Sequence, residues 1–486
     1  MSADAQALLD TGLAAFISGD LDGAKQSLTS AAEASTLPMA NLLLGALAFA
    51  DEDFPECQRQ WEEAFRLART TGDQRTAARA ATSLGSLHYD AYGNEAASRG
   101  WLSRASRLLD REGRCVERGY LELALVACNV RDVSALEESA TVALDLAIEF
   151  NDPSLEARAL ADGGLALISQ GMLAKGFNRL DEAMAPVSAG EVDPMVAGMI
   201  YCALLTACER TGELRRAEEW TRAAKEFATT RFAGRLPVLH AHCRLAYGTV
   251  LCDAGRLSEA EEELLCALEP GLSACVPKNA EAAAHLAGLR MLQGRLDEAW
   301  EVLAPFADRF EVCEPMARLH YMRGELDLAA AVIGRALAEM VGDRLRAGRL
   351  LGLLVDVQLA SGDVDAAERS AERLADYADE SDSPILRAES KLADGRVVAA
   401  RGDPRAATGA FRGALDALGG EERPILSGTL RLDLAYSLAD AGDSATALDE
   451  ARAALAVLGR VGADHHAARA ASLIERLGTP APAPRA

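Results

Sequence analysis

The sequence lacks any long apolar run. Its longest nearly apolar stretches, residues 37–50 and 195–208, are about fourteen residues each, whereas a helix that spans a bilayer needs about twenty. The opening residues Met-Ser-Ala-Asp-Ala lack the basic region of a secretory signal and lead directly into a helical pattern. We therefore expect a cytoplasmic protein with no membrane partner.

Basic residues are also scarce. Fifty Lys and Arg residues face seventy-four Asp and Glu residues, which gives a net charge of -24, and only five of the basic residues are lysines. Nucleic-acid binding depends on basic side chains that replace the counterions of the phosphate backbone. The charge balance therefore argues against direct binding of nucleic acid.

Motifs of catalysis and cofactor binding are missing as well. The sequence has no G-x-S-x-G, no H-E-x-x-H, no G-x-G-x-x-G, no G-x-x-x-x-G-K-[ST] and no EF-hand loop. We therefore predict a protein that is not an enzyme, with no catalytic residues, no cofactor and no metal.

Cysteine is present without the C-x-x-C spacing of a zinc clip. Seven of the ten cysteines fall within one quarter of the chain, with His240, His242 and His285 among them. They are Cys202, Cys208, Cys243, Cys252, Cys266, Cys275 and Cys313. A metal or redox sensor is one interpretation, but small buried thiols packed in a core explain the pattern more simply.

Regular proline and glycine punctuation is the strongest positive signal. A proline precedes a glycine by seventeen or eighteen residues in six places: 153 and 171, 194 and 212, 237 and 255, 277 and 294, 384 and 402, and 424 and 442. Proline is tolerated in the first turn of a helix, and glycine readily adopts the left-handed conformation that ends one. Each pair therefore predicts one helix.

A second helix follows each of these glycines. It opens with a recurring stub, such as GELRRA at 212–217, GRLSEA at 255–260 and GRLDEA at 294–299. Extending this frame predicts an all-α solenoid of about twelve hairpins wound into a right-handed superhelix. We assign residues 1–477 to the solenoid and residues 478–486, which are rich in proline and alanine, to a disordered tail.

Within a hairpin, small and large residues recur at helical spacing. Gly395 on one predicted helix precedes Ala407, Phe411 and Ala414 on the next, and Gly45 with Trp61 and Gly85 with Trp101 occupy equivalent points. Small residues at a helix crossing allow close approach. This pattern resembles the tetratricopeptide repeat, although most units here are longer than the usual 34 residues.

A closer resemblance covers nearly the whole chain. Segments 171–191, 196–220 and 344–367 are similar to the repeat region of large actinobacterial LuxR-type transcription regulators and related cyclase-linked proteins. The resemblance implies signal sensing or partner binding beside a nucleotide-binding module and a helix-turn-helix domain. This sequence has no phosphate loop, and the resemblance would place the helix-turn-helix domain at about the point where residue 486 stands. We expect either a separate sensor arm or a regulator whose DNA-binding part is supplied by another chain.

The leading functional hypothesis is an interaction or signal-sensing module whose groove, lined by the first helix of each hairpin, holds its partner. The occupant would be a protein or peptide, such as a helix-turn-helix regulator or a cyclase, or a small signal molecule. The polar and aromatic residues that helical phase turns toward the middle of this groove are Arg158, Arg210, His242, His285, Arg318 and Tyr321.

The ninth hairpin departs from the pattern. Pro315 precedes Gly324 by only nine residues, which predicts a first helix of barely two turns and a notch in the inner wall near His285, Arg318 and Tyr321. The alternative is a longer helix that includes residues 306–313 and bends at Pro315.

Overall fold

The chain folds into helices throughout its described part. The computed structural model describes residues 3–35, 37–127, 132–269, 274–419 and 423–478, which contain 25 α-helices, two short 3₁₀ helices and no strand. The first helices of the twelve hairpins are α1 (Ala3–Ser18), α3 (Pro38–Ala50), α5 (Gln74–Asp90), α7 (Val116–Ala127), α9 (Pro153–Ser169), α11 (Pro194–Thr211), α13 (Pro237–Asp253), α15 (Val276–Leu292), α17 (Cys313–Met322), α19 (Arg344–Ala360), α21 (Pro384–Ala400) and α23 (Pro424–Asp440).

Each first helix is followed by its partner. The second helices are α2 (Leu21–Ala34), α4 (Phe54–Thr71), α6 (Glu95–Leu109), α8 (Val133–Phe150), α10 (Leu173–Ala189), α12 (Leu214–Phe232), α14 (Leu257–Ala267), α16 (Leu296–Leu303), α18 (Leu326–Glu339), α20 (Val364–Asp379), α22 (Pro404–Leu418) and α24 (Ser444–Val461). A final helix, α25 (Asp464–Gly478), follows the twelfth hairpin. The all-α solenoid predicted from the sequence is therefore confirmed. Of the tail predicted at 478–486, only Gly478 lies within the described residues.

Local sequence rules set the helix ends. Pro194 opens α11 in its first turn, and Gly212 ends that helix with a φ of 64°, in the left-handed region. Many second helices begin with an aspartate cap; the Asp403 carboxylate, for example, accepts a hydrogen bond of 3.0 Å from the backbone N–H of Ala406. The proline and glycine punctuation therefore marks real helix boundaries.

Close helix crossings hold the two helices of a hairpin together. A Cβ added to Gly45 would lie 2.3 Å from the ring of Trp61, and one added to Gly395 would lie 2.5 Å from the ring of Phe411. The equivalent contact of Gly85 is with Leu102, so the predicted pairing with Trp101 is wrong by one residue. Any larger side chain at these glycines would push the two helices apart.

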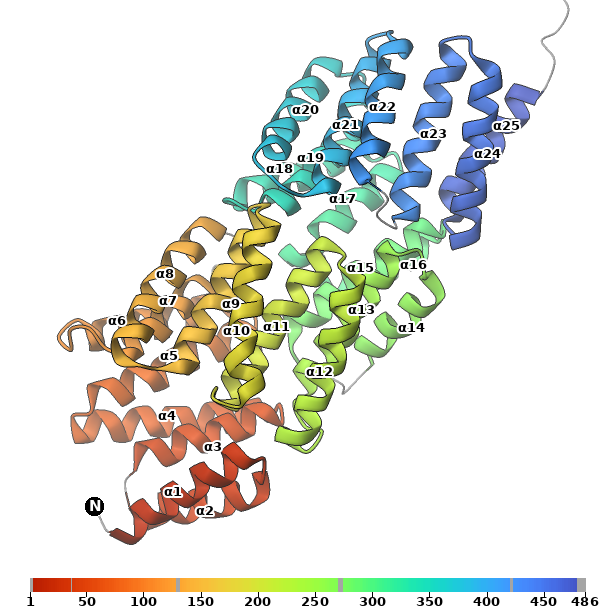
Figure 1. Ribbon diagram of the computed structural model, residues 1–486. Coiled ribbons are helices and arrows are strands. Elements are labelled where there is room, and N and C mark those ends of the chain that lie inside the picture. The colour runs from red at the N-terminus through yellow and green to blue at the C-terminus, as the bar shows by residue number, and fades with distance from the viewer. Residues whose placement is uncertain (1–2, 36, 128–131, 270–273, 420–422, 479–486) are drawn as a thin grey trace, which may run out of the picture.

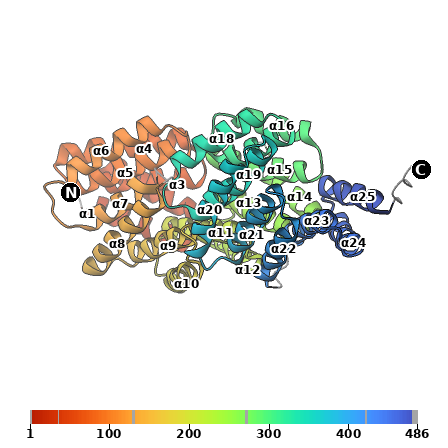
Figure 2. The same ribbon diagram turned by 90° about the horizontal axis from the view of Figure 1, so that it is seen from above.

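Successive turns of the superhelix contact one another. Hydrogen bonds of side chains join residues separated by 170 to 222 positions in several places along the chain. A single hydrophobic core accordingly includes residues of α1–α3, α9–α13 and α17–α21. In Figure 1 the teal helices α18–α20 lie above the golden helices α8–α10, while α1 and α25 lie at opposite ends of the molecule in Figure 2. The contacts between turns therefore correspond to a superhelical turn of 170 to 222 residues, or four to five hairpins.

The contacts between turns satisfy exposed helix ends. The Asp382 carboxylate, in the loop before α21, accepts hydrogen bonds from the backbone N–H groups of Leu173 (2.6 Å) and Ala174 (3.0 Å) at the start of α10. Arg423 donates to the carbonyl oxygen of Thr211 at the end of α11. Free N–H and C=O groups at helix ends require partners, so these contacts bind one superhelical turn to the next. We call this line of contacts the seam.

The ninth hairpin is irregular, as expected. Its first helix, α17, has 10 residues, whereas α15 and α19 have 17 each. Two 3₁₀ helices, η1 (Ala304–Phe306) and η2 (Phe310–Val312), precede α17 in place of a longer helix. The short helix is therefore confirmed, and the alternative of a helix continuing from residue 306 through Pro315 is wrong.

None of the helices in the described residues combines the length and hydrophobicity needed to cross a bilayer.

Candidate functional site: an enclosed cavity

The first helices surround a cavity of about 610 Å³ inside the superhelix. Residues of α3, α5, α7, α9, α11, α13 and α15 line most of it. Because the helix pairs stack with their first helices inward, the predicted concave surface becomes the wall of this cavity. Contacts between successive turns narrow the groove that an open solenoid would leave.

One part of the wall is apolar and aromatic. Phe49 stacks on Trp61 with ring centroids 6.2 Å apart, and the indole N–H of Trp61 donates a 3.0 Å hydrogen bond to the carbonyl oxygen of Leu42. The polar atom of Trp61 is therefore satisfied, and its ring adds only apolar surface. The neighbouring apolar lining consists of Met39, Leu43, Phe54, Leu87, Met195, Met199, Leu236, Val238 and Leu239.

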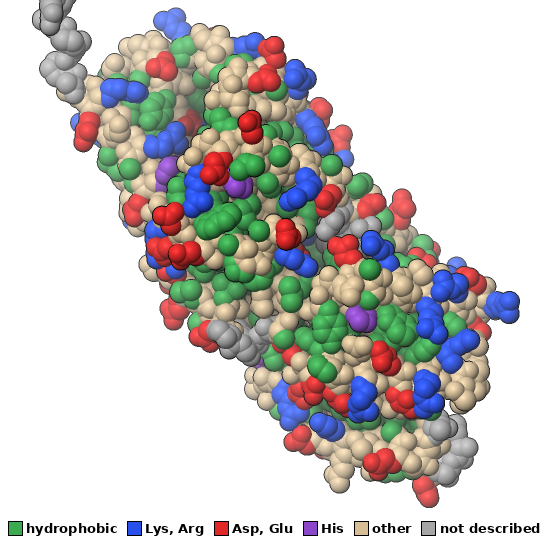
Figure 3. Space-filling view, turned by 180° about the vertical axis from the view of Figure 1, so that it is seen from behind, with side chains coloured by type: hydrophobic (Ala, Val, Ile, Leu, Met, Phe, Trp, Pro, Cys, Tyr) green, Lys and Arg blue, Asp and Glu red, His purple; other side chains and the backbone are tan. Residues whose placement is uncertain are grey.

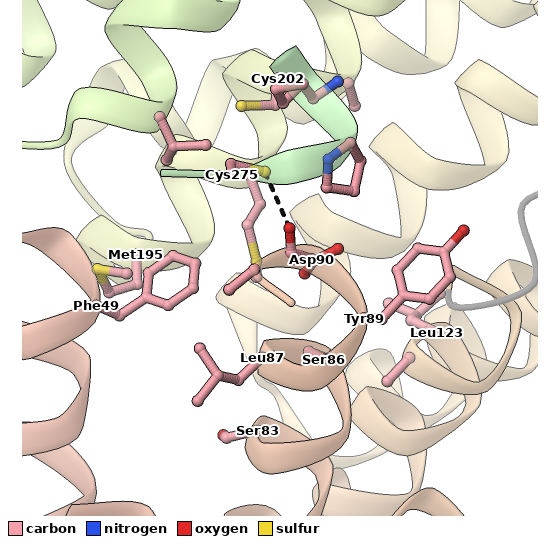
Figure 4. Close-up of a pocket in the computed structure, with 18 of the residues that line it drawn as sticks. Phe49, Ser83, Ser86, Leu87, Tyr89, Asp90, Leu123, Met195, Cys202 and Cys275 are labelled. Atoms are coloured by element: carbon pink, nitrogen blue, oxygen red, sulfur yellow. Dashed lines mark hydrogen bonds between the residues drawn. The ribbon is translucent and has the colours of Figure 1, made fainter. Parts of the chain in front are cut away.

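Another part of the wall is a polar cluster to which five helices each contribute one residue. Its members are Asp90 of α5, Arg158 of α9, Cys202 of α11, His242 of α13 and Lys278 of α15. Figure 4 shows Asp90 between Cys202 and Cys275 on one side and the apolar Leu87, on its own helix, on the other. We call these five residues the polar cluster.

The two cations of the cluster bind carboxylates of their own helices. The Nε of Arg158 lies 2.7 Å from Asp162, four residues further along α9. The Nζ of Lys278 lies 2.7 Å from Glu281, three residues further along α15. These pairs hold each cation on its own helix and leave the space between helices open.

Asp90 is the acid of the cluster. It is the last residue of α5, and its backbone carbonyl accepts a hydrogen bond from the Cys275 thiol at 3.0 Å. Among the described residues, no Lys, Arg or His nitrogen lies within 4.0 Å of its carboxylate. Burial raises the pKa of Asp90 to about 6, although the charges of Arg158 and Lys278 oppose this increase.

His242 contributes an uncharged imidazole. The residue is fully buried, and its Nε2 lies 3.2 Å from the hydroxyl of Thr206, while its Nδ1 has no hydrogen-bond partner among the described residues. Burial, with a smaller contribution from Lys278, lowers the pKa of His242 to about 3. The ring is therefore neutral near pH 7, and its buried Nδ1 is left without a hydrogen-bond partner among the described residues.

Three of the six residues predicted from the sequence line this cavity. They are Arg158, Arg210 and His242. Arg210 donates to the Ser169 hydroxyl and lies 3.5 Å from Asp343, the residue that caps α19 of the next superhelical turn. Arg210 therefore helps to close the cavity as well as to line it.

The other three lie further along the interior. His285 of α15 binds Glu209, a residue of the cavity wall, at 2.9 Å. Burial alone would raise the pKa of Glu209, but the hydrogen bond and charge of His285 hold it below its usual range. Arg318 lies 3.2 Å from Glu314 on α17, and Tyr321 packs against the hydrophobic core.

The predicted notch does not extend the cavity toward Tyr321. Neither His285, Arg318 nor Tyr321 belongs to the cavity lining. Instead, residues 308–311, which precede the short α17, reach the cavity and line part of it. The missing half of a regular first helix is thus replaced by a 3₁₀ segment that contributes to the wall.

Sequence reasoning missed several wall residues. Asp90 stands at a helix end without any motif, and nothing in its neighbours indicates that it is enclosed. Lys278 carried a weak signal, because it is one of only five lysines and follows Pro277 at a predicted helix start. Trp61, which the sequence pattern pairs with Gly45, lies in a hydrophobic core and also lines the cavity.

Four of the seven clustered cysteines are buried, and Cys202, Cys252 and Cys266 are half-buried. Burial raises the pKa of Cys202 to about 11 and those of Cys208 and Cys243 to about 12. Such shifts favour the unreactive thiol over the thiolate. Within the described residues, no group of three or more His, Cys, Asp or Glu side chains is arranged to hold a metal ion.

Among known proteins, similarity to this chain is found in solved structures. No protein-family model matches the sequence. No curated protein matches it either. Similar solved structures include a chain of the APC/C hetero-tetramer Cut9-Hcn1 (14% identity, 98% of this chain and 97% of that chain covered, TM-score 0.42) and yeast Tom70 (15%, 96% and 96%, 0.32). A tetratricopeptide repeat protein from Parabacteroides merdae is 16% identical over 58% of this chain and 98% of its own, with a TM-score of 0.33. The similarity is one of helical-repeat architecture.

Proposed function

We propose that this chain is a non-catalytic, signal-sensing repeat module that binds a small molecule in the cavity of its superhelix. The observation that carries the proposal is the cavity itself. Its volume of about 610 Å³ falls within the 300–1,000 Å³ that is typical of small-molecule sites. Its wall combines a large apolar surface with a few converging polar groups, which is the usual composition of such sites.

The closure of the superhelix favours a small molecule over a folded partner. An open tetratricopeptide groove can accept an extended peptide or a domain, but here the seam joins successive turns across the groove. A bulky partner would have to break hydrogen bonds such as those between Asp382 and the start of α10. A small molecule would require no such separation, so protein partners are assigned to the outer surface.

The chemistry of the polar cluster supports binding rather than catalysis. Burial raises the pKa of Cys202 to about 11, so this group is a thiol at neutral pH and a poor nucleophile. His242 has a pKa of about 3 and is therefore a weak base near pH 7. These protonation states suit groups that form hydrogen bonds with a ligand.

The regulatory part of the proposal rests on the sequence resemblance to LuxR-type repeat regions. We propose that the occupied module acts on transcription through a partner, such as a helix-turn-helix protein or a cyclase. The net charge of -24 disfavours direct contact with DNA. In Figure 3, acidic and basic side chains are interspersed over the face shown. A gel shift at low salt should show no complex with DNA, and a salt-sensitive complex would favour a regulator that acts alone.

A cavity-filling substitution tests the binding function. Met199 lines the cavity and is 40% exposed, and Leu328 on α18 is 53% exposed and does not line it. Both positions can accept a larger side chain without a clash in the core. Met199→Trp should weaken binding of the uncharged fluorescent probe N-phenylnaphthylamine by about tenfold or more, because it occupies ligand volume.

Leu328→Trp is the matched control and should bind the probe like the wild type. Thermal melting of both variants would verify that they fold. Probe binding that does not saturate, or that responds equally to both substitutions, would contradict a site in this cavity.

A further inference from the structure

The polar cluster restricts the chemistry of the ligand, if the cavity is the binding site proposed above. We infer that the ligand is an uncharged amphiphile whose head both donates and accepts a hydrogen bond, such as a carboxamide, joined to an apolar chain. The head would lie among Asp90, Arg158, His242 and Lys278, and the chain along the apolar wall near Phe49 and Trp61.

The arrangement of charges disfavours either sign on the head. Arg158 and Lys278 each have a carboxylate on their own helix at 2.7 Å, so neither lacks a counter-charge. Asp90 has no such partner within 4.0 Å among the described residues, yet it lies within electrostatic reach of both cations. An anionic head would meet the Asp90 carboxylate, and a cationic head would meet Arg158 and Lys278. Each of these encounters costs free energy in a buried site.

The unused hydrogen-bonding capacity calls for both a donor and an acceptor. The Asp90 carboxylate can only accept near pH 7, and no hydrogen bond to it is formed by any described side chain. The guanidinium of Arg158 uses its Nε for Asp162 and has further N–H groups, and the ammonium of Lys278 has further protons beyond its bond to Glu281. A carboxamide offers an N–H to the first group and a carbonyl to the others.

His242 provides a second, independent observation. Its side chain is fully buried, lines the cavity and has an Nδ1 without a partner among the described residues. A buried polar atom normally has a hydrogen-bond partner. Because the ring is neutral, it places no charge beside the head, and its Nδ1 can act as donor or acceptor according to the tautomer.

The apolar wall indicates the rest of the ligand. Figure 4 places Phe49 and Met195 to one side of Asp90, with Leu87 one turn earlier on α5. The stacked rings of Phe49 and Trp61 extend this surface. An alkyl or other apolar chain attached to the head would be buried there, where each methylene group contributes to binding.

Three probes with the same decyl chain separate the alternatives. Decanamide, decanoate and decylammonium differ only in the charge of the head, and each can compete with N-phenylnaphthylamine at about pH 7.5, below its micelle concentration. Burial raises the pKa of Asp90 to about 6, so its carboxylate is ionised in this assay. We expect decanamide to bind at least about tenfold more tightly than either charged probe, because a buried like charge is that costly.

The substitution Asp90→Asn tests whether the charge of Asp90 is what weakens the binding of a negatively charged head. It keeps the shape of the side chain and removes the negative charge, so decanoate should bind about tenfold more tightly than to the wild type. Decanamide should change by less than about threefold, since an amide side chain can still accept its hydrogen bond. The matched control is Asp308→Asn, an acid of the cavity lining outside the polar cluster, which should leave the order of the three probes unchanged.

The results separate the two proposals. Equal affinity for all three probes, or tightest binding of a charged probe, would overturn the inference about the head while the displaced fluorescent probe would still support a binding cavity. An unchanged decanoate affinity in Asp90→Asn would also overturn it. Failure of N-phenylnaphthylamine itself to bind would overturn the proposed function, and the inference with it.

Discussion

The two cations of the polar cluster differ from an arginine further along the inner face in where their carboxylate partners lie. Around the cavity, Arg158 and Lys278 bind carboxylates of their own helices. Toward the C-terminus, Arg396 of α21 instead binds Asp356 of α19 and Asp433 of α23, each at 2.6 Å. We call the inner faces of α19, α21 and α23 the C-terminal wall.

The direction of the ion pairs explains this difference. A pair along one helix orients a charged side chain without joining helices, so space between helices can remain. A pair that crosses from one helix to the next draws both together, and Arg396 does this on two sides at once. A charged residue on the inner face of a first helix can therefore line a cavity when its ion-pair partner lies on the same helix. It can hold neighbouring helices together when its partners lie on those helices.

Loss of Arg396 should have the largest effect on stability. Arg396→Met would leave Asp356 and Asp433 in the C-terminal wall without their shared cation, and breaking a buried pair of this kind costs about 3–5 kcal/mol. Arg158→Met should cost less, because it leaves one carboxylate, that of Asp162, without its cation, whereas Arg396→Met leaves two. Urea denaturation of both variants would measure this difference.

The control for this prediction also removes the charges of the two aspartates that bind Arg396. Arg396→Met combined with Asp356→Asn and Asp433→Asn should recover much of the lost free energy of unfolding. Equal losses in Arg396→Met and Arg158→Met would remove the distinction between the two regions.

Asp90→Asn should instead increase the free energy of unfolding near pH 7.5, and so stabilise the protein. The folded-state pKa of Asp90 is raised to about 6 from an ordinary value of 3.8. The folded state therefore loses stability as pH rises from about 4 to about 6, and this loss persists at higher pH. Removing the charge should recover up to about 3 kcal/mol.

The pH profile distinguishes this effect from a general change in packing. The gain of Asp90→Asn should shrink as the pH falls from about 6 to about 4 and disappear below about pH 3, where the wild-type carboxyl is protonated in both states. Asp433→Asn in the C-terminal wall should instead destabilise the protein at neutral pH, because it removes a partner of Arg396. A gain for Asp433→Asn, or none for Asp90→Asn, would contradict the comparison.

Added volume should also separate packed crossings from the cavity. Ala260 and Ala407 are fully buried on second helices, so Ala260→Phe and Ala407→Phe should each cost about 1–3 kcal/mol. Ala46 lines the cavity, so Ala46→Phe should cost much less. The midpoints of chemical denaturation would measure the three losses of stability. A loss for Ala46→Phe as large as for the other two variants would contradict the prediction.

The smallest expected effect concerns the seam that joins the two regions. Asp382→Ala removes the cap of α10 and should cost about 1 kcal/mol. Asp403→Ala, which removes a cap inside its own hairpin, should cost a similar amount. Hydrogen exchange should show increased opening of α10 only in Asp382→Ala; the same protection pattern in both variants would mean that the seam does not couple the regions.

Local features of the fold could be predicted from the sequence because they depend on neighbouring residues. Proline in a first turn and a left-handed glycine mark a helix wherever they occur, and the crossing of Gly395 with Phe411 follows from spacing alone. Helical phase also placed Arg158, Arg210 and His242 on the inner face, where they line the cavity. How they act in binding stays a prediction.

The closure of the superhelix could not be predicted in the same way. Its pitch is the sum of small rotations between hairpins, and no residue pattern encodes that sum directly. Asp382 and Arg423 therefore gave no sign that they would bind helix ends about 210 residues earlier. Asp90 was missed for the same reason, since Lys278 and Arg158 come from hairpins far from it in the chain.

The spacing of the seam along the sequence also constrains how this protein can evolve. Most helical-repeat arrays gain or lose units freely, because each unit contacts only its neighbours. Here a duplicated or deleted hairpin between residues 171 and 382 would move Asp382 away from α10 and misalign every later contact between turns. We therefore expect relatives of this chain to vary in loops and outer surfaces while keeping the number of hairpins per turn constant.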